Sequence, residues 1–157
     1  MSNIIIFHDD TSIRKYIKDN NFDYIENWDV SNVTNMSRLF SSHGDFNLDI
    51  SNWDVSNVID MSYMFSDCRI FNQNISQWKV DNVTDVSYMF ENCNNFNQPI
   101  GNWNVNNVTN MGCMFSLCDV FDQDIGNWDV SNVTNMRYMF YQCMNFTVSW
   151  QTVTILN

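Results

Sequence analysis

A 25-residue repeat constrains the fold of this chain more than any other feature. Tryptophan recurs at this spacing five times, and six further columns stay unchanged when the copies are aligned on it. Self-similarity of this kind is typical of an architecture in which each turn stacks on the previous one and buries a continuous core. We assign the tryptophan and phenylalanine columns to that core: Trp28, Trp53, Trp78, Trp103, Trp128, Phe65, Phe90, Phe115, Phe71, Phe96 and Phe121.

Each repeat contains two hydrophobic periods. In residues 50–56, Trp53 and Val55 alternate with polar residues, as in a half-buried strand. After Asn57 the apolar residues recur at spacings of three and four, which predicts a short helix over residues 58–68 with Asn57 as its N-cap. The sequence therefore predicts an α/β solenoid of five turns, each made of one strand and one short helix.

The two ends differ from the repeats, as the capping segments of a solenoid do. Residues 1–24 predict an N-terminal cap, with a short strand over Ile4–Phe7 and a helix capped by Asp10 or Thr11. Residues 25–146 form the repeat region. Residues 147–157 predict a C-terminal cap, in which Val148–Leu156 forms a final edge strand.

The charge balance excludes several classes of partner. The chain has 18 Asp and Glu against 7 Lys and Arg, a formal net charge of -11. Binding of nucleic acid phosphates or of an anionic membrane surface needs clustered Lys and Arg, so we expect neither. No stretch resembles a signal peptide or a membrane span, so we expect a protein that is cytosolic or delivered by something other than a signal peptide.

Four cysteines form a column of their own, on the apolar side of the predicted helices. Zinc sites usually bring paired ligands such as C-x-x-C, and the chain has none, so we expect buried, reduced thiols and no bound metal. Cys113 lies in a different column and is expected to be the accessible thiol. The buried column consists of Cys68, Cys93, Cys118 and Cys143.

Catalysis has little support in the sequence. The histidines are His8 and His43, and no nucleophile elbow, metalloprotease motif or phosphate-binding loop is present. Neither a catalytic residue nor a cofactor is expected. The Asn57 and Asn72 columns lack the glycine pattern of calcium-binding solenoids, so we expect them to make capping and turn hydrogen bonds.

The repeat resembles the BspA-type surface-protein repeat, a family related to leucine-rich repeats and largely of unknown function. The resemblance rests on residues 50–58, on Met61-Ser62-Tyr63-Met64-Phe65 and on Phe71-Asn72-Gln73, and it covers residues 22–146. It implies a right-handed, leucine-rich-repeat-like stack used for protein contacts. Surface members carry signals or lipid anchors, so the absence of a signal here favours a viral or intracellular member, in a virion or the host cytoplasm.

Two hypotheses about function follow. The chain is either a module that binds a protein partner, or a structural building block that self-associates through its open ends. Specific binding needs positions that differ between turns, and the polar side of the strands differs in turns three and four, where Lys79 is the only cation. The predicted partner-binding residues are Gln77, Lys79, Asp81, Asn102, Asn104 and Asn106. The rival surface consists of Tyr63, Tyr88, Tyr138, Ile70, Leu117 and Val120.

Overall fold

The computed structural model describes residues 4–147. Within them the regular elements all lie near the N-terminus: strand β1 (Ile5–Ile6), helix α1 (Asp10–Lys18), the 3-10 helix η1 (Ile25–Asn27) and strand β2 (Trp28–Asp29). β1 and β2 pair in parallel, with Ile5 opposite Trp28. The edge strand predicted over Val148–Leu156 lies outside the described residues.

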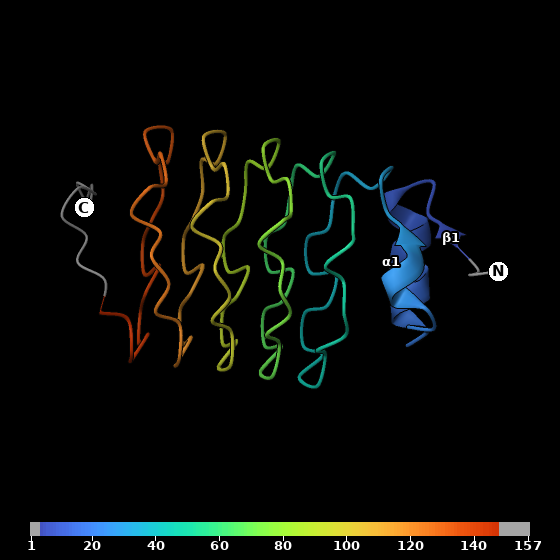
Figure 1. Cartoon of the computed structure of the whole chain (residues 1–157), viewed down its shortest axis with the longest axis horizontal. Helices are drawn as coiled ribbons and strands as arrows, with labels where there is room; N and C mark the ends of the chain where they lie inside the picture. Colours follow the sequence, from blue (N-terminus) through green and yellow to red (C-terminus); the bar gives the residue numbers. More distant parts are fainter. Residues whose placement is uncertain (1–3, 148–157) are drawn as a thin grey trace.

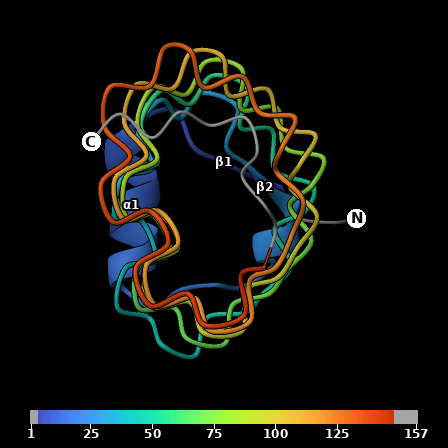
Figure 2. The same ribbon diagram turned by 90° about the vertical axis from the view of Figure 1, so that its left-hand side faces the viewer.

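From β2 onward the chain winds into turns that lie side by side along the long axis of the molecule (Figure 1). Viewed along that axis, the turns overlay one another (Figure 2). Turns one to five begin at Ile25, Ile50, Ile75, Ile100 and Ile125. Backbone hydrogen bonds join neighbouring turns, since the amide of Met61 donates to the carbonyl of Asp85 at 3.0 Å. The 25-residue spacing is therefore the spacing between stacked neighbours.

The helix predicted over residues 58–68 is not formed. This segment is a series of tight turns, in which the amide of Met64 donates to the carbonyl of Met61 at 3.1 Å. Tyr63 and Asp67 have φ values of 57° and 64°, the left-handed region that the third position of a type II turn requires. Because the amides of Met61 and Tyr63 donate to the next turn, they are not available for helical bonds. Consecutive short turns also bring residues three apart to one side, which explains the misleading period.

The predicted strand segment also differs from the expectation. Alternation is present, since Trp78 and Val80 are buried while Lys79 is exposed, but residues 75–81 contain no strand. Side chains join the turns here instead. The indole Nε1 of Trp78 donates to the carbonyl of Ile50 at 3.2 Å, and Nδ2 of Asn82 donates to the carbonyl of Ser56 at 2.7 Å. The backbone ladder between turns thus runs through the segment predicted to be helical.

A second set of amide side chains joins the turns on another side of the stack. Oδ1 of Asn72 accepts from the backbone amide of Asn97 at 3.0 Å, and Nε2 of Gln98 donates to the carbonyl of Asn72 at 2.9 Å. Asn47 makes the same pair of bonds with the next turn: its Oδ1 accepts from the backbone amide of Asn72, and its carbonyl accepts from Nε2 of Gln73. The repeated amides therefore hold neighbouring turns together.

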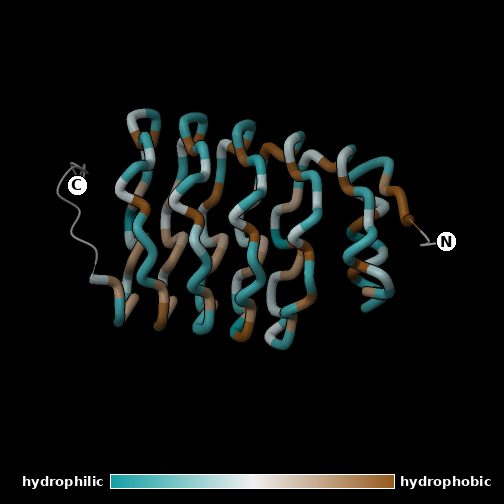
Figure 3. The backbone as a smooth tube through the Cα atoms, viewed as in Figure 1, coloured by the Kyte–Doolittle hydropathy of each residue, from teal (hydrophilic) through white to brown (hydrophobic). Residues whose placement is uncertain are grey.

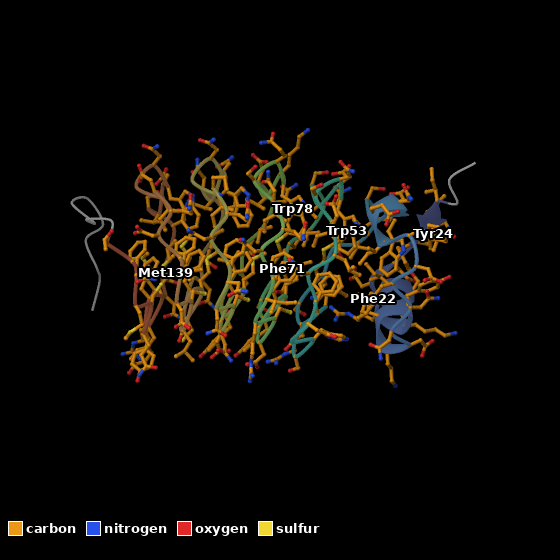
Figure 4. All side chains as sticks on the ribbon, turned by 60° about the horizontal axis from the view of Figure 1, so that its bottom comes forward. Phe22, Tyr24, Trp53, Phe71, Trp78 and Met139 are labelled. Carbon is orange, nitrogen blue, oxygen red and sulfur yellow. The ribbon has the colours of Figure 1, made fainter. Side chains whose placement is uncertain are left out.

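The core is a set of stacked aromatic columns inside the coil. Within one turn, the rings of Phe65 and Phe71 stack with centroids 4.0 Å apart, and Phe65 stacks on Phe90 of the next turn at 5.7 Å. All the core residues predicted from the tryptophan and phenylalanine columns are buried. Figure 4 shows Trp53, Phe71 and Trp78 directed into the interior. Hydrophobic residues recur at the same level in successive turns (Figure 3).

The N-terminal segment packs on turn one. Ile13 and Ile17 of α1 are buried, and Tyr16 meets the ring of Trp28 edge-on at 5.8 Å. The N-cap of α1 is Asp9 rather than Asp10 or Thr11, because Oδ1 of Asp9 accepts from the amide of Ser12 at 2.7 Å. None of the helices within residues 4–147 is long and apolar enough to cross a membrane.

Candidate polar binding strip

In most repeats the backbone makes three tight bends that are each closed by a hydrogen bond to an Asp or Asn side chain. Oδ1 accepts from the backbone amide two residues later, for example from Ser56 to Asp54 at 3.1 Å and from Ser62 to Asp60 at 2.8 Å. Such bonds define Asx turns and fix the chain direction locally. The Asp-x-Ser pattern of the sequence is the signal that predicts these turns.

Turn three departs from this arrangement at two positions. In the column that contains Asp54, the side chains of turns one, two, four and five accept such a bond, whereas turn three has Lys79. In the column of Asp49, Asn74 and Asp124, turn three has Pro99. Neither Lys79 nor Pro99 has a side-chain acceptor, so each lacks the bond that the other described residues of its column make.

The six residues predicted to bind a partner are all exposed. The structure joins two of them across the turn boundary, because Nδ2 of Asn104 donates to Oδ1 of Asp81 at 2.7 Å. Lys79 lies one turn from Asp54 in the same column. Hydrogen bonds from Ser56 lower the pKa of the Asp54 carboxyl, and the positive charge of Lys79 makes a smaller contribution in the same direction. Gln77 and Lys79 also line a surface depression, together with Asn52, Asp54 and other residues of turn two. We call the six residues the polar strip.

The Asx turns also set the electrostatics of the surrounding surface. Hydrogen bonds from the serine two residues later hold the pKa of four aspartates below the usual value. These carboxylates are ionised at neutral pH and give the strip an acidic surrounding, and the hydrogen bonds keep them ionised to a lower pH than a free aspartate. They are Asp29, Asp49, Asp54 and Asp129.

The rival surface is only partly a continuous surface. Tyr63 and Tyr88 stack with centroids 4.4 Å apart, and the guanidinium of Arg38 lies 3.8 Å from the ring centroid of Tyr63. A hydrogen bond with Cys113 is the main cause that raises the pKa of Tyr88 to about 12. Tyr138 instead contacts Tyr141 and is 69% exposed.

The apolar residues of the rival surface are scattered. Ile70 and Val120 are exposed, but they lie two turns apart in one column, with Asn95 between them. Leu117 is half-buried. The structure therefore joins Tyr63 and Tyr88 and leaves the other members apart.

The thiols are mainly part of the core. Cys68, Cys93 and Cys118 are buried, and their Sγ atoms contact backbone carbonyls one turn back, such as that of Phe40 at 3.1 Å. Burial raises the pKa of all three, for Cys68 to about 12. Cys143 was predicted to be buried but is half-buried, because turn five is the last turn of the described stack.

Cys113 was predicted to be accessible and is half-buried, since its Sγ lies 3.8 Å from the carbonyl of Arg137. His43 is half-buried against the carbonyl of Phe40, whereas His8 is exposed. Residues 4–147 contain no group of three or more His, Cys, Asp or Glu side chains placed to hold a metal ion.

The stacked turns and their internal hydrogen bonds define a repeat protein. The sequence matches the family described as Mycoplasma protein of unknown function, DUF285, once over residues 10–116 and again over residues 75–157. The chain belongs to this family of repeat-containing proteins of unknown function. Neither the curated proteins nor the solved structures contain a match to it.

Proposed function

We propose that the chain is a non-catalytic repeat module that binds a protein partner through the polar strip of turns three and four. The observation that carries this proposal is Lys79. Four other turns place an Asp or Asn at this position and gain a local hydrogen bond. Turn three instead presents an exposed cation, which suggests selection for something other than stability.

The chemistry of the strip indicates the kind of partner. Lys79 is flanked by Asp54 in turn two and by Asn104 in turn four, and Asp81 lies two residues along the chain. A single cation within an acidic and amide-rich surface favours a partner of mixed or positive charge and fixes its orientation. The net charge of -11 would speed the encounter with a positively charged partner.

The finer assignment to the BspA-type repeats is part of this proposal. It is supported by the recurrence of the Trp-x-Val and Met-x-x-Met-Phe segments in successive turns. Right-handed, leucine-rich-repeat-like coiling and a viral or intracellular setting remain predictions of the same resemblance.

The test compares two double variants as bait in the native host extract. A protein retained by the wild-type chain should be lost with Lys79→Glu and Asn104→Arg, which reverse or add charge on the strip. It should be kept by Tyr63→Ser with Tyr88→Ser, the matched control on the rival surface. Loss with the tyrosine variant and retention with the strip variant would place the interface on the tyrosine side.

A structural building block is the second candidate, and one observation favours it. The backbone amides of Met136 and Tyr138 occupy ladder positions of turn five and have no hydrogen-bond partner within residues 4–147. Backbone donors at the end of a stack can pair with another chain. Mass photometry over a dilution series separates the two: a binding module stays at 18.6 kDa, whereas a building block forms larger species as concentration rises.

A further inference from the structure

The first turn of the stack has an edge that faces away from the other turns. Inside the stack, the carbonyls of Asp60 and Ser62 accept from the amides of Met36 and Arg38 in the preceding turn, at 2.9 and 2.8 Å. The equivalent carbonyls in turn one belong to Asn35 and Ser37. They point toward the N-terminal end, where no preceding repeat lies.

Arg14 of α1 supplies the donors that a preceding turn would supply. Its Nη2 donates to the carbonyl of Asn35 at 3.1 Å, and its Nη1 donates to the carbonyl of Ser37 at 2.8 Å. Nη2 also lies 2.7 Å from Oδ1 of Asn35. The planar guanidinium presents two donors at a fixed spacing, so one side chain replaces two backbone amides.

Asp10 supplies the complementary acceptor. Within the stack, the amide of Thr84 donates to the carbonyl of Ile59 in the preceding turn at 2.8 Å. In turn one the equivalent amide, that of Thr34, donates to Oδ1 of Asp10 at 2.7 Å. The amide of Asn35 donates to the same oxygen at 3.0 Å. Asp10 and Arg14, one helical turn apart on α1, thus bond donors of this edge and two of its four ladder carbonyls; the other two belong to Leu39 and Ser41.

We propose that Asp10 and Arg14 form an edge cap that stops a second copy of the chain from docking on turn one. The docking partner would be turn five of that copy. Its amides of Met136 and Tyr138 are the repeat equivalents of the donors that Arg14 replaces, and the carbonyl of Thr134 is the equivalent of the acceptor that Asp10 replaces.

The cap and a second copy compete for the same atoms. α1 lies at the N-terminal end of the stack, in the place that a further turn would take (Figure 1). A second copy can therefore dock only when α1 leaves turn one, and the bonds of Asp10 and Arg14 help to hold α1 there. An edge that pairs with a different edge of the next copy does not close on itself, so uncapped chains would extend head to tail. Native proteins often block strand edges in this way with charged side chains. This inference is independent of the partner proposed for the polar strip.

The test is the oligomeric state of Asp10→Ala with Arg14→Ala, measured by sedimentation velocity over a concentration series. The wild-type chain should sediment as one species throughout. The double variant should give a weight-average sedimentation coefficient that rises with concentration. Lys15→Ala with Asp19→Ala is the matched control, because it removes the same charges from two exposed residues, one in α1 and one at its C-cap, and it should behave as wild type.

Amide hydrogen exchange shows whether the variant is folded and where it associates. In the wild-type chain, Thr34 should be protected as strongly as Thr84, and in the dilute variant its protection should fall while that of Thr84 stays. Concentrating the variant should restore the protection of Thr34. A variant that keeps the protection of Thr84 and stays monomeric at every concentration would overturn the proposal, as would rapid exchange of Thr34 in the wild-type chain.

Discussion

Lys79 is the residue at which stability and binding are expected to oppose each other. Lys79→Asn restores an Asx acceptor for the amide of Asp81 and should raise the free energy of unfolding by about 0.5–1 kcal/mol, the usual net worth of one hydrogen bond. Lys79→Gln is the matched control, because its amide is one carbon too long for the same turn. Chemical denaturation of the two variants checks this, and equal stabilities would show that the lost bond has no cost.

Trp78 lies in the central turn, with neighbours on both sides. Trp78→Ala should lower the free energy of unfolding by about 3–5 kcal/mol, because a large cavity opens and the carbonyl of Ile50 loses its indole donor. Asn102→Ala, at an exposed position of the polar strip, should cost less than about 0.5 kcal/mol. Thermal melts of the two variants measure the difference, and similar melting temperatures would refute the inward placement of the tryptophans.

The thiols are expected to react at different rates. Cys113 should be modified first by an alkylating reagent at neutral pH, because Cys68, Cys93 and Cys118 are buried and a raised pKa disfavours the reactive thiolate. Cys143 should also react slowly, since its pKa is raised to about 12. Mass spectrometry over a time course orders the sites. Labelling of Cys93 before Cys113 in the folded protein would contradict this order.

At the scale of the element, the Asx turn carries a pH dependence. The hydrogen bonds of Asp54 lower its pKa in the folded state, so their stabilisation is present above the unfolded pKa of about 4 and is lost as the pH falls through the folded value. Asp54→Asn keeps an acceptor oxygen but does not titrate. Its free energy of unfolding should therefore fall less steeply below pH 4 than that of the wild type, in denaturation curves recorded from pH 5 to 2.

The element scale is also where prediction from sequence was weakest. The columns identified the buried residues of the inner turns, because equivalent positions of stacked turns have equivalent surroundings; Cys143, in the last described turn, is an exception. They did not predict the backbone conformation of residues 58–68, since a run of tight turns and a helix both place residues that are three apart on the same side. The left-handed conformation of Tyr63 and Asp67 has no signal in one sequence, as neither is the glycine that such positions favour.

At the scale of the whole molecule, the repeat length predicted the stacking of turns, and the same spacing now separates hydrogen-bonded neighbours. The exposure of the polar-strip residues could also be predicted from sequence, because they alternate with buried residues. The hydrogen bond that Lys79 lacks could not be predicted from the sequence, because its absence is visible only beside the equivalent bonds of the other turns. The edge cap was missed for a similar reason: Asp10 and Arg14 precede the repeats and belong to no column.

The joining of one turn to the next depends on backbone hydrogen bonds through residues 59–67. Scalar couplings across hydrogen bonds, measured by NMR on the isotope-labelled chain, test it directly. The amide nitrogen of Met61 should couple to the carbonyl carbon of Asp85, and that of Tyr63 to the carbonyl carbon of Ser87. Couplings from these two amides to residues four positions earlier in the chain would indicate a helix and would contradict the account.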